Sequence, residues 1–196
     1  MSGDTFPIVV LGNLHPSVQN KSIKQLLGKN QFLILDTMNF WMDNNLEDLN
    51  KVISKVNLIS INDEEAYLLT KEKSLENCAS KIIKKGPQYV IIKKGELGAE
   101  LYSKDEKFSL PSFRVKAIDP TGAGDTFAGG LAAYLSKNKK IDFNSLKKGL
   151  VLGTILASFT VEDLGTSCIE RVVKKNILER LEIFINKNKI DLNLSI

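Results

Sequence analysis

Short apolar runs alternate with longer amphipathic stretches through the first half of the chain. Four runs rich in Ile, Leu and Val are typical of buried strands: Pro7–Leu11, Phe32–Leu35, Val56–Ile61 and Tyr89–Ile92. Apolar residues recur at helical spacing in four further segments: Pro16–Leu27, Leu46–Ser54, Asn62–Thr70 and Leu75–Lys85. Since strands that alternate with helices pair in parallel, the pattern predicts an α/β fold with a doubly wound, mostly parallel sheet flanked by helices.

The second half of the chain begins differently. Gly95 and Gly98 lie between the last of these strands and a further apolar run, Ala99–Tyr102, which predicts a hairpin at a sheet edge. After Pro111 the chain is irregular, and three helical patterns follow it: Ala123–Leu135, about Phe143–Thr160 and about Ile169–Lys187. No internal repeat or low-complexity linker interrupts these patterns, so we expect a single domain over residues 1–196.

The composition narrows the class of protein. Hydrophobic residues make up 43% of the 196 and charged residues 26%, which is ordinary for a globular domain. The net charge is +4, but the lysines are scattered and no basic block lies beside aromatic residues, so nucleic-acid binding is not indicated. Cys78 and Cys168 form no CxxC or Cys/His pattern, which favours a cytoplasmic setting. Phe6–Leu11 is too short for a signal sequence or a membrane span.

A glycine-rich segment, DPTGAGDTFAGG from Asp119 to Gly130, carries the clearest chemical signal. A glycine-rich turn that leads into a helix presents free backbone N–H groups and the positive end of the helix dipole to an anion. Asp125 lies within the first turn of that helix, so a base would stand beside a phosphate, as phosphoryl transfer requires. The alternative is an ordinary helix start, with Gly122 as N-cap and Asp125 complementing the dipole. The residues alone do not decide between the two interpretations.

Two other glycine motifs fail on spacing. Phe127 stands where the dinucleotide motif GxGxxG requires its third glycine. The P-loop motif GxxxxGK[ST] is absent, because Gly28-Lys29 is followed by Asn30 and preceded by no matching glycine. A Rossmann-like binding domain of another class, which would hold a pyrophosphate at its first βα turn, is therefore disfavoured.

The DPTGAGDTFAGG segment resembles the signature of the ribokinase-like (PfkB) carbohydrate and nucleoside kinase family. The resemblance implies ATP-dependent transfer of the γ-phosphoryl group to an alcohol of a sugar or nucleoside. It also implies that the backbone of Gly122, Ala123, Gly124 and Asp125 forms an anion hole, with Asp125 as the base. ATP and magnesium are the cofactors that the resemblance implies, and many members also hold a monovalent cation such as potassium. A non-catalytic nucleotide-binding fragment or a regulatory pseudokinase is the alternative.

Asn62-Asp63-Glu64-Glu65 follows a predicted strand and matches the NxxE element of the same family. The resemblance implies that Glu65 helps to organise magnesium, mostly through water, and that Asn62 lies near the nucleotide phosphates. An N-terminal capping box, with Asn62 as N-cap and Glu65 at the third helical position, explains the same residues without any ligand.

Two further segments resemble nucleotide-binding parts of the family. Lys93–Ala99, with Gly95 and Gly98, is similar to the glycine loop that passes over the nucleotide, although many members carry Thr or Ser where Lys93 stands. Ala157–Thr160 and the loop through Gly165 resemble the helix and loop beside the adenine. In many members this loop also helps to hold a monovalent cation, with residues at the positions of Asp119 and Thr121. Close helix packing is the alternative explanation of Ala157 and its neighbour Ser158.

Substrate recognition is the least defined part of the prediction. Asp36 and Asn39 follow a predicted strand, and residues at the carboxyl end of a parallel strand are candidates for contacting substrate. Elsewhere, His15 has no partner pattern and Trp41 is more typical of core than of a stacking platform. In the family the signature follows an N-terminal part with the first strands, a lid and most substrate contacts. We expect that part to be absent here, which would leave an exposed sheet edge and favour a homodimer.

Overall fold

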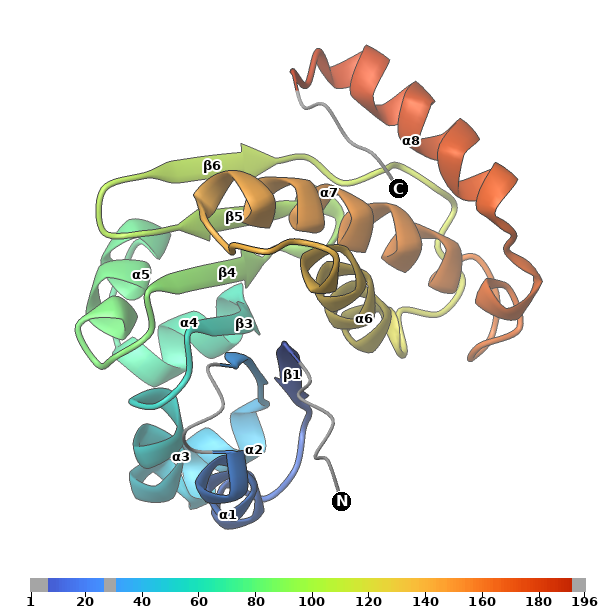
Figure 1. Ribbon diagram of the computed structural model, residues 1–196. Coiled ribbons are helices and arrows are strands. Elements are labelled where there is room, and N and C mark those ends of the chain that lie inside the picture. Colours follow the sequence, from blue (N-terminus) through green and yellow to red (C-terminus); the bar gives the residue numbers. More distant parts are fainter. Residues whose placement is uncertain (1–6, 27–30, 192–196) are drawn as a thin grey trace. The chain divides into compact units, whose positions relative to one another are not determined.

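The computed structural model describes residues 7–26 and 31–191 of the chain (Figure 1). The strands are β1 (Ile8–Leu11), β2 (Phe32–Asp36), β3 (Leu58–Asn62), β4 (Tyr89–Lys93), β5 (Ala99–Tyr102) and β6 (Lys107–Leu110). The helices are α1 (Pro16–Leu26), α2 (Asn39–Asn44), α3 (Leu46–Ile53), α4 (Asp63–Thr70), α5 (Leu75–Ile83), α6 (Ala123–Ser136), α7 (Phe143–Thr160) and α8 (Lys174–Asn188). Two short 3₁₀ helices complete the set, η1 (Gly95–Leu97) and η2 (Ile169–Arg171). Phe6 and the predicted helix end at Leu27 lie outside the described residues.

The chain divides into two compact units, which are described separately below. The first comprises Met1–Lys94 and Glu100–Phe108, and the second comprises Gly95–Ala99 and Ser109–Ile196. The expectation of a single domain stays a prediction.

The six strands form one sheet in the order β1-β2-β3-β4-β5-β6. β1, β2, β3 and β4 pair in parallel, with helices in each connection. The connections from β4 to β5 and from β5 to β6 are too short for a crossover and therefore reverse the strand direction. The prediction of an α/β fold with a mixed, mostly parallel sheet flanked by helices is confirmed.

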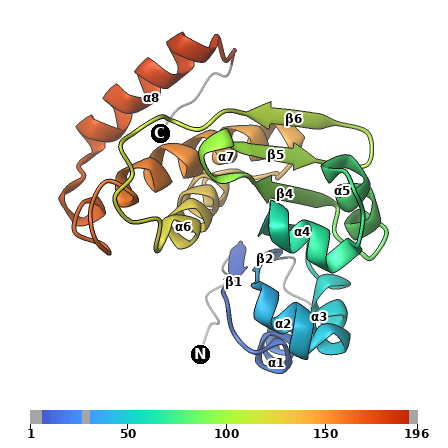
Figure 2. The ribbon, with the colours of Figure 1, turned by 180° about the vertical axis from the view of Figure 1, so that it is seen from behind.

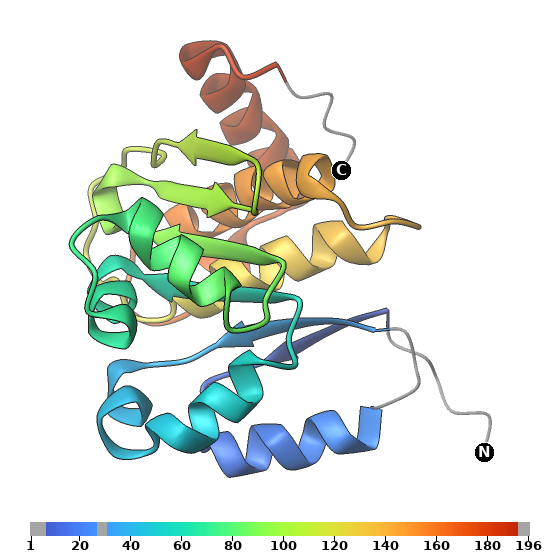
Figure 3. The same ribbon diagram turned by 90° about the vertical axis from the view of Figure 1, so that its left-hand side faces the viewer.

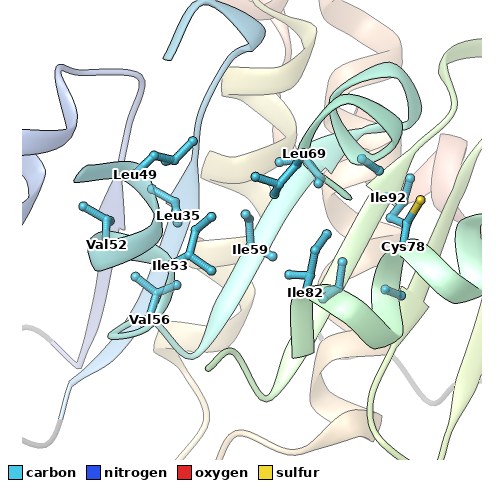
Figure 4. Packing of buried hydrophobic residues seen from close by; sticks show 14 of the residues in the cluster. Leu35, Leu49, Val52, Ile53, Val56, Ile59, Leu69, Cys78, Ile82 and Ile92 are labelled. Atoms are coloured by element: carbon cyan, nitrogen blue, oxygen red, sulfur yellow. The ribbon is translucent and has the colours of Figure 1, made fainter. Parts of the chain in front are cut away.

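The core of the first unit lies between the sheet and the helices that connect its parallel strands. Alternate strand residues such as Leu35, Ile59 and Ile92 point to the same face of the sheet. They pack there against α3 and α5, with Val52 and Ile82 among the buried contacts (Figure 4). Figure 3 shows α1 and α3 lying along one side of β1 and β2. Each fully buried Leu or Ile side chain contributes roughly 1.5–3 kcal/mol, so this face is the main source of stability in the first unit.

The second unit is built on the close pairing of α6 and α7 (Figure 2). Glycines allow the two backbones to approach. A Cβ atom on Gly153 would lie 2.7 Å from the carbonyl oxygen of Phe127, and one on Gly130 would lie 3.0 Å from the Cα of Gly153. The last helix, α8, packs on α7. This pairing fixes the start of α6, where the glycine-rich segment lies.

Two expectations about secondary structure were wrong, and one short helix was not predicted. The predicted hairpin exists, but β5 is not the sheet edge, because β6 follows and pairs beyond it. The helix predicted over 169–187 is divided into η2 and α8, since the backbone at Val172 and Val173 is extended. α2 was not predicted, because six residues are too few for a helical pattern to be distinct.

Candidate functional site

The turn at Gly122 starts α6 in a conformation that favours glycine. Gly122 is the N-cap residue and has a φ of +79°, in the left-handed region. A Cβ atom at this position would meet only the Thr160 methyl group, at 3.7 Å, so the backbone angle rather than crowding requires glycine. The local prediction of a glycine turn that leads directly into a helix at Ala123 is therefore confirmed.

The first turn of α6 presents unpaired donors. The N–H of Ala123 donates to the Pro120 carbonyl at 3.1 Å, and that of Thr126 donates to the Gly122 carbonyl at 2.9 Å. Between them, the N–H groups of Gly124 and Asp125 have no acceptor among the residues that the structure describes. Two free N–H groups at the positive end of a 14-residue helix can bind an anion.

The side chain of Asp125 is exposed at the same turn. Its carboxylate makes no hydrogen bond or ion pair to any described residue. It stands at the third helical position, where a carboxylate in an ordinary capping box would accept the N–H of the N-cap residue. A carboxylate that bonds to no described residue and two free N–H donors thus share one helical turn, which is the arrangement of a base next to an anion site.

Two other helix starts in the molecule have capping boxes. In α4, the Asn62 side chain accepts the Glu65 N–H at 2.7 Å, and the Glu65 carboxylate accepts the Asn62 N–H at 2.8 Å. In α7, Asp142 and Ser145 exchange equivalent bonds. Neither bond is made at the start of α6. An ordinary capped helix start therefore describes α4 and α7 well. It describes α6 less well.

Asp119 holds the segment that precedes the turn. Its carboxylate accepts the Thr121 N–H at 2.9 Å and the Gly165 N–H at 3.4 Å. Hydrogen bonds from the side chain and backbone of Thr121, with a smaller contribution from Gly165, lower the pKa of Asp119 below its ordinary value. The structure thus brings together three predicted residues of the second unit, Asp119, Thr121 and Gly165, through one carboxylate.

The end of α7 supports the same segment from its other side. The Val161 carbonyl accepts the N–H groups of Ile118 at 2.7 Å and Asp119 at 3.3 Å. The Thr160 hydroxyl donates to the Thr126 hydroxyl at 2.9 Å, which links α7 to the first turn of α6. This contact between Thr126 and Thr160 was not predicted. No motif spacing could have found this contact, because 34 positions separate the two threonines.

In the first unit, the strand ends bring predicted residues together. β2 ends at Asp36 and β4 ends at Lys93, whose ammonium group lies 3.3 Å from the Asp36 carboxylate. Lys93 also aligns with Asn62 in the β3–β4 register. Burial raises the pKa of Glu65, while the Asn62 N–H and the charge of Lys93 oppose that rise. Asp36, Asn62, Glu65 and Lys93 therefore occupy one edge of the parallel strands.

Asn39 belongs to the same region but makes a local contact. It is exposed at the start of α2, and its side-chain oxygen accepts the N–H of Phe40 at 2.8 Å. Nothing in this contact distinguishes a substrate residue from an ordinary helix start.

The predicted glycine loop is shaped by its own backbone. Gly95 and Gly98 have φ values of +54° and +95°, and the Gly98 N–H donates to the Gly95 carbonyl at 3.1 Å. A Cβ atom on Gly98 would lie 2.0 Å from the Leu110 carbonyl oxygen, so glycine is required there for packing. Gly165 also has a positive φ, of +57°. Ala157 is half-buried in the last turns of α7. A nucleotide role for these residues stays a prediction.

Two features are absent from the described residues. No group of three or more His, Cys, Asp or Glu side chains is arranged to hold a metal ion. No described helix is both long and apolar enough to cross a bilayer.

Comparison with known proteins identifies the family to which the chain is similar. Residues 16–171 match the family described as pfkB family carbohydrate kinase. An inositol 3-kinase of Arabidopsis thaliana is 26% identical over 144 residues, which are 74% of this chain and 35% of the relative. A nucleoside kinase of Methanocaldococcus jannaschii is 41% identical over 95 residues, 47% of this chain and 29% of the relative. The chain thus spans about a third of the length of these curated relatives.

A solved structure supports the fold. The fructokinase of Vibrio cholerae, in its fructose, ADP and calcium ion bound form, superposes with a TM-score of 0.81 at 18% identity. The alignment covers 92% of this chain and 62% of the fructokinase. At this identity the likeness shows a shared fold only. The match of the family over residues 16–171 covers most of the chain, which therefore belongs to the pfkB family of carbohydrate kinases.

Proposed function

We propose that this chain is the nucleotide-binding and catalytic part of an ATP-dependent small-molecule kinase. The reaction would transfer the γ-phosphoryl group of ATP to an alcohol of a sugar or nucleoside. Membership of the family supports the class of reaction, and relatives named as inositol and nucleoside kinases support the class of acceptor.

One observation carries the proposal. The free N–H groups of Gly124 and Asp125 and the unbonded Asp125 carboxylate occupy a single helical turn. The capping boxes of α4 and α7 satisfy such groups mutually, whereas the N-cap of α6, like those of α2 and α3, makes no side-chain bond. The donors are held by the backbone and do not have to reorganise when charge develops on a phosphoryl group. Such donors are usually the largest catalytic contribution, at roughly 3 kcal/mol each.

The chemical step assigns the remaining roles. The acceptor hydroxyl oxygen forms a bond to the γ-phosphorus, and its proton passes to the Asp125 carboxylate. The bond between the γ-phosphorus and the bridging oxygen breaks, and its electron pair leaves with ADP. The N–H groups of Gly124 and Asp125 stabilise the charge on the transferring oxygens. A positioned base of this kind contributes about 10²–10⁴-fold to the rate.

Residues of the first unit would serve the phosphates and their metal ion. Magnesium bound to ATP would neutralise part of the phosphate charge. Glu65 fits a role through water, because one carboxylate oxygen already accepts the Asn62 N–H and burial disfavours its ionised form. Lys93 could neutralise a phosphate only by sharing its charge with Asp36, 3.3 Å away. Asp36 and Asn39 are proposed to face the acceptor, and Asp119 and Thr121 a potassium ion.

The glycines and the end of α7 complete the proposed nucleotide site. Gly95 and Gly98 would cover the nucleotide, with Ala157 and Gly165 beside the adenine. The alternative function is that of a nucleotide-binding fragment or regulatory pseudokinase that retains the anion site without turnover.

Calorimetry tests the proposal on the chain itself. ATP with magnesium should bind, and replacing Gly124 by proline, which removes one of the two free N–H groups, should weaken the affinity by about tenfold or more. Proline removes no intrahelical bond in the first turn of a helix but disfavours a helical backbone at Ala123, so the melting temperature of the variant is measured beside its ATP affinity. A matched control is Gly129→Ala, on the same helix, where a Cβ atom meets no heavy atom within 4 Å. Equal ATP affinity in both variants would reject the anion site at Gly122–Asp125.

A further inference from the structure

Arg180 of α8 makes a concentrated set of contacts with the end of α7. Its guanidinium donates to the Ser158 hydroxyl at 3.0 Å and to the Glu162 carboxylate at 2.8 Å. The same group lies 3.5 Å from the centroid of the Phe159 ring and 5.0 Å from that of Phe113. The Arg180 side chain is only 16% exposed. A shielded cation with two charge-assisted hydrogen bonds and an aromatic face holds its partners firmly.

The residues that Arg180 holds are adjacent to those that support the anion turn. Thr160, one position after Phe159, donates to Thr126 in the first turn of α6. The Val161 carbonyl, one position before Glu162, accepts the Ile118 and Asp119 N–H groups. The end of α7 therefore contacts Arg180 and, through the neighbouring residues Thr160 and Val161, both flanks of Gly122–Asp125.

We propose that Arg180 is a positioning residue that fixes the Gly122–Asp125 turn through the end of α7. This role rests on the proposed kinase function, since it concerns the placement of the anion site. A base and two backbone donors must be held close to their productive positions, and a displacement of about 1 Å can cost 10²-fold in rate. Gly130 and Gly153 let the backbones of α6 and α7 approach closely. Arg180 supplies a polar restraint at the end of α7 where the turn is attached.

A neighbouring ion pair offers a matched control. Arg171 and Asp163 form a pair at 2.6 Å in the same loop region, but their side chains are 71% and 37% exposed. Exposed pairs contribute little, because solvent screens their charges. Replacing either arginine removes one ion pair from the second unit. Only the replacement of Arg180 also removes aromatic contacts and the hydrogen bond to Ser158.

Amide hydrogen exchange on the ligand-free chain tests the coupling independently of activity. Arg180→Met, which keeps the aliphatic stem, should speed exchange at the Ile118, Asp119 and Thr126 amides by about tenfold, the effect of losing one charge-assisted bond. Arg171→Met should leave these amides unchanged. Amides in the middle of α6 serve as an internal reference for folding. Should Arg180→Met fail to fold, Glu162→Gln removes the same ion pair from the other side and should change the same amides.

Nucleotide binding and turnover give the second measurement. In protein that binds ATP, Arg180→Met should weaken ATP affinity, or lower kcat, by about tenfold relative to Arg171→Met, with an unchanged KM for the acceptor. Arg180→Lys, which keeps the cation without the planar fork, should fall between them. Unchanged exchange at 118–126 in a folded Arg180→Met protein would overturn the positioning role. If the wild-type chain binds no ATP, the proposed function fails, while the exchange result still decides whether Arg180 controls the turn.

Discussion

Replacing Glu65 by glutamine and by alanine separates its two possible roles, as a helix cap and as a magnesium-organising residue. Glutamine keeps an oxygen where the Glu65 carboxylate accepts the Asn62 N–H at 2.8 Å, so the capping box of α4 should survive. Alanine loses that bond, which should cost about 1 kcal/mol. In a chain of this length, that loss corresponds to roughly 2–4 °C in melting temperature.

The pH dependence of stability follows from the burial of Glu65. Burial raises its pKa from the ordinary 4.5, despite the opposing Asn62 N–H and Lys93 charge. A raised pKa in the folded state means that the folded chain binds the proton more tightly than the unfolded chain. This contribution to stability is complete below the unfolded pKa and is lost as pH rises through the folded pKa. Glu65→Gln carries no charge, so its stability relative to wild type should increase as pH rises through that window.

The magnesium response distinguishes the two roles. ATP affinity is measured by calorimetry across a range of magnesium concentrations, and melting temperature is measured on the same samples. If Glu65 organises magnesium through water, Glu65→Gln should raise the half-saturating magnesium concentration by about tenfold with little change in melting temperature. Ser145→Ala removes the corresponding bond from the α7 capping box and should lower only the melting temperature. An equal melting-temperature loss in Glu65→Gln and Glu65→Ala, with an unchanged magnesium response, would show that Glu65 is only a cap.

Three further predictions concern catalysis, packing and the isolated chain. In a form of the protein that phosphorylates an acceptor, Asp125→Asn should lower kcat by about 10²–10⁴-fold with little change in melting temperature, because its carboxylate bonds to no described residue. Steady-state kinetics that show near-normal turnover would reject Asp125 as the base. Gly153→Ala places a methyl group 2.7 Å from the Phe127 carbonyl oxygen and should cost about 1–3 kcal/mol in urea unfolding, whereas Gly129→Ala should be neutral or stabilising. The isolated chain should bind ATP and self-associate through β1, an edge strand of the described sheet. Calorimetry and light scattering test this, and a chain that stays monomeric at high concentration would contradict the association.

Local patterns in the sequence were enough to determine most of the elements. The predicted helix Phe143–Thr160 has the same bounds as α7, because an N-terminal cap at Asp142 and regular apolar spacing are both local features. β6 escaped prediction, since its four residues include only two apolar ones and its pairing partner supplies the evidence that it is a strand. The break before α8 depends on an extended backbone at Val172 and Val173, residue types that also occur within helices.

For the candidate site, the sequence alone determined the glycine turn and the position of Asp125 within it. Both depend on a few consecutive residues, whose backbone angles and helical position are set locally. Only the tertiary structure decided which distant groups support or neutralise that chemistry. Asp36 is paired with Lys93, and Arg180 reaches the end of α7 from another helix. Such contacts are absent from any sequence window, because they form only when packing brings together segments far apart along the chain.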